Sequence, residues 1–142
     1  MTSAHVLALY EPSGRGEASV RHAAEVAAKA GARLTVVTVA IAEPTDGQCC
    51  DRRSVYWNGV VHGFAEDELA RARAALGSET AADFRVVSGR SVPSALAREI
   101  ERCGVDTVVV PRRRSWLPWA RAQHVRQLQR RTALAAVLLA PD

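Results

Sequence analysis

The hydrophobic pattern of the chain alternates between short apolar runs and longer segments with helical spacing. The apolar runs are rich in valine and leucine and lack strict alternation, which is typical of strands buried on both faces. They occupy residues 4–10, 33–40, 84–89, 105–110 and 133–140. Between them, apolar residues recur at steps of three and four, which indicates helices. These segments run from residue 17 to Gly31 and over residues 54–76, 92–103 and 120–131.

This order predicts an α/β protein in which each strand is followed by a helix. Right-handed crossovers place the helices on both faces of one parallel sheet, so we expect a three-layer α/β/α architecture with an open five-stranded sheet. A length of 142 residues suits a single domain spanning residues 1–142. The irregular stretch 41–53 is expected to cover the carboxyl edge of the sheet, where such folds usually bind ligands.

The predicted helix over residues 54–76 is expected to bury its aromatic side chains. Trp57 and Phe64 share its helical spacing with Val61, Leu69 and Ala72, and Gly77 follows as a stop signal. We therefore interpret the aromatic residues of this helix as core and not as a ligand box.

Composition narrows the functional classes. The formal charge is +4, and Lys29 is the only lysine among 19 basic residues, a bias that either a GC-rich genome or anion binding explains. There is no apolar run of membrane-spanning length and no signal-type leader, so we expect a cytoplasmic protein without a membrane partner. Cys49, Cys50 and Cys103 form no disulfide or zinc pattern, which favours reduced thiols over a redox or metal role.

Catalytic patterns are not evident. The four histidines are widely scattered, and no Ser/His/Asp order or carboxylate pair stands out. We therefore expect no enzyme activity, no catalytic residues and no bound metal.

Several segments together resemble the universal stress protein family. The resemblance is carried by the order and spacing of residues 5–9, 32–39, 86–89, 104–110 and 136–141. It implies an adenine-nucleotide α-hydrolase-like fold with sheet order 3-2-1-4-5, and a homodimer that pairs the last strands of two subunits.

The nucleotide motif of the family is degenerate in this chain. ATP-binding members carry an acidic residue at the end of the first strand, and a motif of two glycines, then a Gly-Ser or Gly-Thr pair, after the fourth. Here Tyr10 stands for the acidic residue, Pro111 and Arg114 for the first glycines, and Gln123-His124 for the later pair. Gly89 matches the usual pattern. The resemblance therefore implies that the usual ATP site is lost.

A rebuilt anion site is the alternative. Arg112, Arg113 and Arg114 could hold a phosphate by side-chain forks, with Trp116 and Trp119 as an aromatic platform, or the tryptophans could pack the loop while the arginines stay solvated. The candidate cofactor-binding residues are Tyr10, Gly89, Arg112, Arg113, Arg114, Gln123 and His124.

Three functions follow. The first is a dimeric stress-response or regulatory domain that binds no ATP or other cofactor and acts through protein contacts. The second is a variant that binds a nucleotide, ATP or AMP, or another anion through the arginine-rich loop. The third, and least favoured, is a nucleic-acid or polyanion binder that uses the basic segment 112–131.

Overall fold

One parallel sheet organises the molecule. The computed structural model describes residues 4–11, 14–41, 52–78, 80–111, 123–132 and 134–140. The strands run β3-β2-β1-β4-β5 across the sheet, and every neighbouring pair is parallel. This confirms the predicted architecture and order. The elements are β1 His5–Leu9, α1 Gly14–Ala30, β2 Arg33–Ile41, α2 Arg52–Leu76, β3 Asp83–Gly89, α3 Val92–Cys103, β4 Thr107–Val110, α5 Gln123–Arg131 and β5 Ala136–Leu139.

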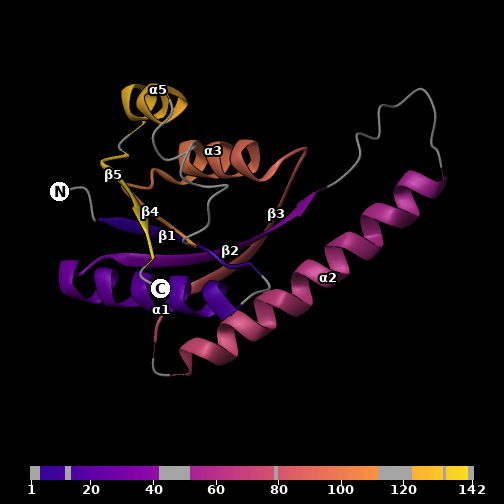
Figure 1. Ribbon diagram of the computed structural model, residues 1–142, viewed down its shortest axis with the longest axis horizontal. Coiled ribbons are helices and arrows are strands. Elements are labelled where there is room, and N and C mark those ends of the chain that lie inside the picture. Colours follow the sequence, from indigo (N-terminus) through magenta and orange to yellow (C-terminus); the bar gives the residue numbers. More distant parts are fainter. Residues whose placement is uncertain are drawn as a thin grey trace.

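Helices cover the sheet on both faces, with α1 and α2 on one side and α3 and α5 on the other (Figure 1). Successive residues of a strand point to opposite faces, so β1 contributes to both halves of the core. Leu7 and Leu9 pack with Leu96 and Ile100 of α3. On the other face, Val6 and Ala8 pack with small α1 side chains such as Ala23.

The boundaries differ from the predicted ones by a few residues. The predicted strand at 105 starts only at Thr107. The residue just before it, Asp106, still bonds to both neighbouring segments, since it donates its N–H to the carbonyl of His5 (3.0 Å) and accepts from the N–H of Ala135 (2.6 Å). The first helix starts at Gly14, three residues before the predicted start at Glu17. Helix α3 begins after Ser91, whose hydroxyl accepts from the N–H of Ser94 (3.3 Å), and ends at Gly104, whose φ of 66° favours glycine.

The prediction that the α2 aromatic residues form core is wrong. Tyr56 is 75% exposed, Trp57 53% and Phe64 64%. The fully buried residues of the helix are small, Ala65 and Ala72, and Leu69 and Leu76 pack against the core beside them. The first half of α2 extends beyond the described strands of the sheet (Figure 1). Helical spacing defines a stripe but does not say whether anything packs on it.

None of the helices within the described ranges is both long and apolar enough to span a bilayer.

Candidate functional site

The carboxyl edge of the sheet is where the sequence predicts a ligand, and its first predicted residue is part of the core. Tyr10 directly follows β1, donates its N–H to the carbonyl of Val37 (2.9 Å) and is 4% exposed. Its ring packs in the cluster beneath α1 and α2. Burial, followed by the charge of Glu17, raises the pKa of the Tyr10 hydroxyl. Tyr10 therefore fills the interior at this edge.

Glu11 is the carboxylate at this edge that the sequence prediction missed. It stands one residue after Tyr10 and is half-buried. Its backbone lies against the first turn of α1, since a Cβ on Gly16 would collide with the Glu11 carbonyl oxygen. Its position immediately after a buried strand and before turn residues is the signal that could have found it.

Gly89, the residue that matches the family pattern, has a structural reason to be glycine. A Cβ at this position would lie 2.8 Å from the Cβ of Ala95. Ala95 is buried in the first half of α3, which packs on β3. The absence of a side chain at Gly89 therefore lets a helix approach, whether or not a ligand also does.

The end of β4 carries a buried proline. Pro111 follows Val110 and is buried, and the carbonyl of Val110 accepts from the N–H of Ala140 (3.0 Å). A proline has no N–H to offer an anion. Arg112, Arg113 and Arg114 lie outside the described residues, as do Trp116, Trp119, Cys49 and Cys50. Gln123 and His124 open helix α5, and only their backbone is described.

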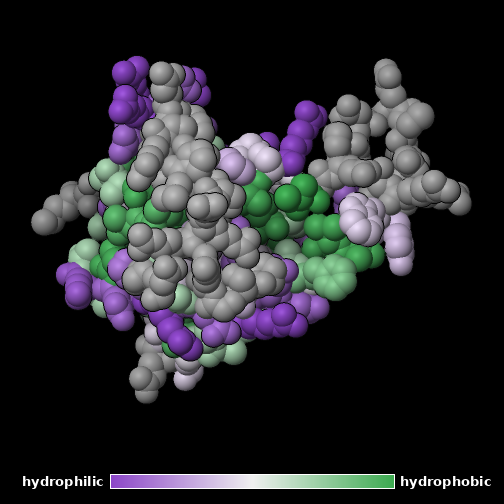
Figure 2. All heavy atoms as spheres, in the orientation of Figure 1, coloured by the Kyte–Doolittle hydropathy of each residue, from purple (hydrophilic) through white to green (hydrophobic). Residues whose placement is uncertain are grey.

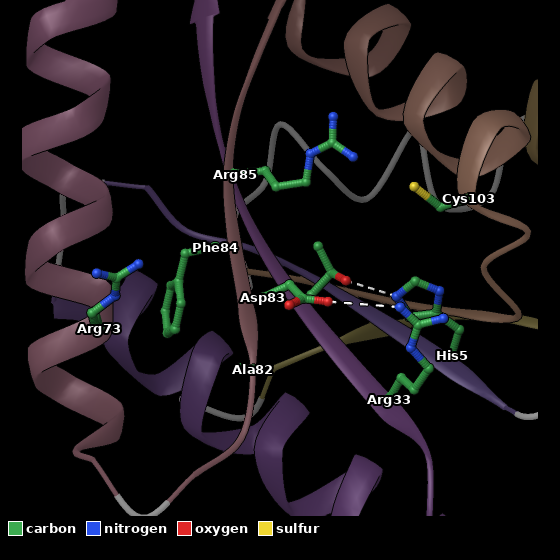
Figure 3. Close-up of a pocket in the computed structure, with 9 residues that line it drawn as sticks. His5, Arg33, Arg73, Ala82, Asp83, Phe84, Arg85 and Cys103 are labelled. Atoms are coloured by element: carbon green, nitrogen blue, oxygen red, sulfur yellow. Dashed lines mark hydrogen bonds and ion pairs between the residues drawn. The ribbon is translucent and has the colours of Figure 1, made fainter.

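A polar depression lies at the opposite, amino edge of the sheet. Its volume is about 500 Å³. The strand starts of β1, β2 and β3 and the end of α3 meet here (Figure 3). It is lined by His5, Arg33, Thr35, Arg73, Ala82, Asp83, Phe84, Arg85 and Cys103.

The floor of this amino-edge pocket is a buried polar pair. His5 Nε2 and Thr35 Oγ1 lie 2.7 Å apart, and the two residues are 7% and 3% exposed. One hydrogen bond between two buried groups removes the cost of leaving either unpaired. The pair therefore explains why two polar residues are tolerated in adjacent strands of the core.

The arginines at the rim are matched by carboxylates. Arg33 lies 3.7 Å from Asp83, and both side chains are exposed. Glu99 of α3 is buried and receives Arg85 at 3.3 Å and Arg102 at 2.8 Å. On the other side of β3, the Arg73 guanidinium stacks 4.8 Å from the centre of the Phe84 ring. Two of the three arginines that line this pocket, Arg33 and Arg85, are thus paired with carboxylates, whereas Arg73 is stacked on a ring.

Cys103 belongs to the same network. Its Sγ donates to Glu99 Oε1 at 3.3 Å. Burial, then the hydrogen bond and charge of Glu99, raise the pKa of the Cys103 thiol above its ordinary value of 9.0. The thiol is therefore protonated at neutral pH and a poor nucleophile. Across the described part of the chain, no three His, Cys, Asp or Glu side chains come together as metal ligands.

Comparison with known proteins places the fold. No family model matches the chain, and no curated protein matches its sequence. Several solved structures do match the chain. A universal stress protein family member from Burkholderia pseudomallei is 22% identical over 98% of this chain and 96% of its own, with a TM-score of 0.58. UspA from Lactobacillus plantarum is 13% identical over 99% of both chains, with a TM-score of 0.69. A universal stress protein in complex with cAMP is 18% identical over 99% of both chains, with a TM-score of 0.54.

The agreement extends over nearly the full length of both partners in each comparison. The order β3-β2-β1-β4-β5 and the parallel pairing are the topology that the sequence resemblance implied. The chain therefore has the fold of the universal stress proteins.

Proposed function

We propose that the protein is a universal-stress-type regulatory domain that does not bind ATP in the manner of the family and acts as a homodimer through protein contacts. The observation that supports this most directly is the buried Pro111 at the carboxyl end of β4. A phosphate-binding loop depends on backbone N–H groups that approach the anion closely. Proline removes one of these donors and adds a ring where a glycine would leave space.

The other described positions at this edge support the same reading. Tyr10 is packed into the core, and the space beside Gly89 is taken by Ala95. Protein atoms thus occupy volume at three of the strand ends that would surround a ligand.

One observation favours a second candidate, a protein that binds a small adenine nucleotide. Glu11 keeps a carboxylate at the end of β1, where an acidic side chain can accept hydrogen bonds from ribose hydroxyls. One structural neighbour was solved in complex with cAMP. AMP or cAMP needs far less of the phosphate-binding loop than ATP does.

Thermal denaturation separates these two candidates. A ligand present at 100 times its Kd stabilises the folded state by about 2.7 kcal/mol, or about 5–10 °C for a protein of this size. We expect no shift of the melting temperature with 1 mM ATP. A shift of several degrees with ATP would contradict the proposal, whereas a shift with AMP that Glu11→Gln removes would favour the second candidate.

The proposed dimer uses the exposed edge of the sheet. Strand β5 pairs with β4 on one side only among the described strands, and all four of its residues are half-buried. An apolar edge strand of this kind invites pairing with another chain. Native mass spectrometry of freshly purified protein is expected to show two chains without a bound nucleotide. Ala136→Glu leaves the core side chains Val137, Leu138 and Leu139 in place. It is expected to shift the mass to one chain while the circular dichroism spectrum stays helical, and a monomeric wild type would contradict the dimer.

A further inference from the structure

The first half of α2 carries an exposed aromatic surface that the proposed function does not use. We define the α2 stripe as Tyr56, Trp57, Val60 and Phe64. Its aromatic side chains are 75%, 53% and 64% exposed, and Val60 is half-buried. Figure 2 shows hydrophobic side chains gathered over this projecting part of the molecule. The three aromatic residues of the α2 stripe are among only seven in the chain. A cluster of this kind on one element marks an interaction surface.

The stripe faces away from the core. Positions 57, 60, 64 and 67 recur at steps of three and four, so they follow one side of the helix. The buried residues Ala65 and Ala72 lie on a different side, against the sheet. The stripe is therefore free to meet a partner without any change in the fold.

Two glycines in the same part of α2 are a second, independent observation. Gly59 and Gly63 lie inside the helix, and a Cβ added to either would meet no atom within 4 Å apart from the helix's own backbone. Each costs about 1 kcal/mol of helix stability relative to alanine. The described part of the chain gives no packing reason for them. Gly63 follows Val60 by three residues, so its missing side chain leaves room beside the stripe for a large side chain of a second helix.

The charges along α2 would complement those of a second α2 helix that runs in the opposite direction. Positions 52 and 53 carry arginines, and positions 66–68 carry Glu-Asp-Glu. In an antiparallel pair of α2 helices that cross at Val60, position 53 of one copy faces Asp67 of the other. At the same crossing, Trp57 and Phe64 of the other copy lie on one side of the contact line, and Tyr56 and Gly63 of the other copy lie on its other side. Large side chains thus meet either the open space of a glycine or another aromatic ring.

From these features we propose that the α2 stripe is a homotypic interface, occupied by the α2 stripe of a second copy in antiparallel orientation. An aromatic side chain buries about 150–250 Å² when covered, so the exposed fractions leave about 400 Å² of aromatic surface open on each copy. The pair covers about 800 Å² from the aromatics, and the flanking residues bring it to the size of a small, transient interface of about 1,000–1,200 Å². Together with pairing at β5, two such isologous contacts link dimers into tetramers or open chains.

Cysteine cross-linking tests this interface and distinguishes it from pairing at β5. In a full-length chain with Cys49, Cys50 and Cys103 replaced by serine, Val60→Cys places two thiols at the proposed crossing point. His62→Cys is the matched control, because His62 is exposed on another side of the same helical turn. Under mild oxidation we expect at least ten times more cross-linked dimer for Val60→Cys than for His62→Cys. Pairing at β5 alone gives no such preference, and equal yields would overturn the proposal.

Charge exchange tests the antiparallel register. Arg53→Asp and Asp67→Arg, each introduced into the Val60→Cys chain, are expected to lower the cross-linking several-fold, and the two together to restore it. Phe64→Glu is expected to abolish it without loss of helical circular dichroism, because the side chain is exposed in one chain. Failure of the double variant to recover would overturn the antiparallel pairing. An uncross-linked protein that sediments with phosphatidylcholine vesicles through Phe64 would assign the stripe to a lipid surface and overturn the proposal.

Discussion

The two edges of the sheet are built from different kinds of interaction. At the carboxyl edge, Tyr10, Gly89 and Pro111 are set by close packing of protein atoms. At the amino edge, polar groups are paired with one another, as in His5 with Thr35 and Glu99 with two arginines. Parallel sheets usually bind ligands at the carboxyl edge. In the described part of this chain, three residues at the carboxyl edge are fixed mainly by packing, whereas the amino edge holds a network of paired charges and hydrogen bonds.

Substitutions at the two edges should therefore have different consequences. At the carboxyl edge, stability depends mainly on packed volume, so an added methyl group is costly, and pH acts there through Tyr10 at alkaline pH. At the amino edge, stability depends on hydrogen bonds and paired charges, so the effect of a substitution depends on pH and on how exposed the group is. The following predictions test this contrast.

The largest effect is expected at the turn into α1. Gly16→Ala places a Cβ against the Glu11 carbonyl oxygen, and we expect a loss of about 3 kcal/mol in the free energy of unfolding. Gly59→Ala is the matched control, since that helical glycine has open space around it and should gain up to about 1 kcal/mol. Urea denaturation measures both. Equal effects in the two variants would show that the space beside Gly16 can accommodate a methyl group.

A smaller loss is expected from the amino-edge network. Glu99→Ala removes a buried carboxylate that pairs with Arg85 and Arg102, and we expect about 2 kcal/mol of destabilisation. Both arginines remain partly exposed and can be hydrated, which limits the cost. Glu101→Ala serves as the comparison, because its contact with Arg131 is exposed and 4.0 Å long, and should cost at most about 0.5 kcal/mol. Similar losses for both variants would mean that Glu99 is no more important than a surface carboxylate.

An alkaline pH dependence is expected from Cys103. Its folded pKa is raised above the ordinary value of 9.0, so its contribution to stability is complete below pH 9 and is lost as the pH rises through the folded pKa. Cys103→Ala should therefore flatten the fall of stability above pH 9. The raised pKa of Tyr10 acts in the same direction from its ordinary value of 10.0, and Tyr10→Phe checks that part. Melting temperatures between pH 7 and 10.5 that fall equally in wild type and Cys103→Ala would contradict this assignment.

The smallest effect is expected for the exposed pair at the rim of the amino-edge pocket. Arg33 and Asp83 are about two-thirds exposed and 3.7 Å apart, so Arg33→Ala should change the free energy of unfolding by less than about 0.5 kcal/mol. The effect should disappear in high salt. A loss above 1 kcal/mol that persists in high salt would show that Arg33 packs against its neighbours more than it pairs with Asp83.

The fold was largely predictable from the sequence, whereas the site was not. Buried parallel strands are recognised as continuous apolar runs, and helices by the three- and four-residue spacing of their apolar positions. Predicting the type and order of the elements therefore needed only local sequence information. The positions of strand ends depended on partners such as Asp106, which bonds to His5 and Ala135 across the sheet. The candidate nucleotide residues came from the family resemblance, which passed over Glu11. The part of that prediction that concerns Arg112, Arg113 and Arg114 stays a prediction.

Residue type and spacing along the chain were enough to predict the α/β alternation and the order of the elements. The replacement of glycine at the end of β4 was noticed only through the family resemblance. Which apolar stripes are covered depended on tertiary contacts. The same spacing that buries Ala65 and Ala72 leaves Trp57 and Phe64 in solvent, because burial requires a second surface within contact distance. The close approach of α3 to Gly89 and the burial of Glu99 between two arginines also depended on tertiary contacts. These contacts join elements whose relative positions cannot be read from periodicity.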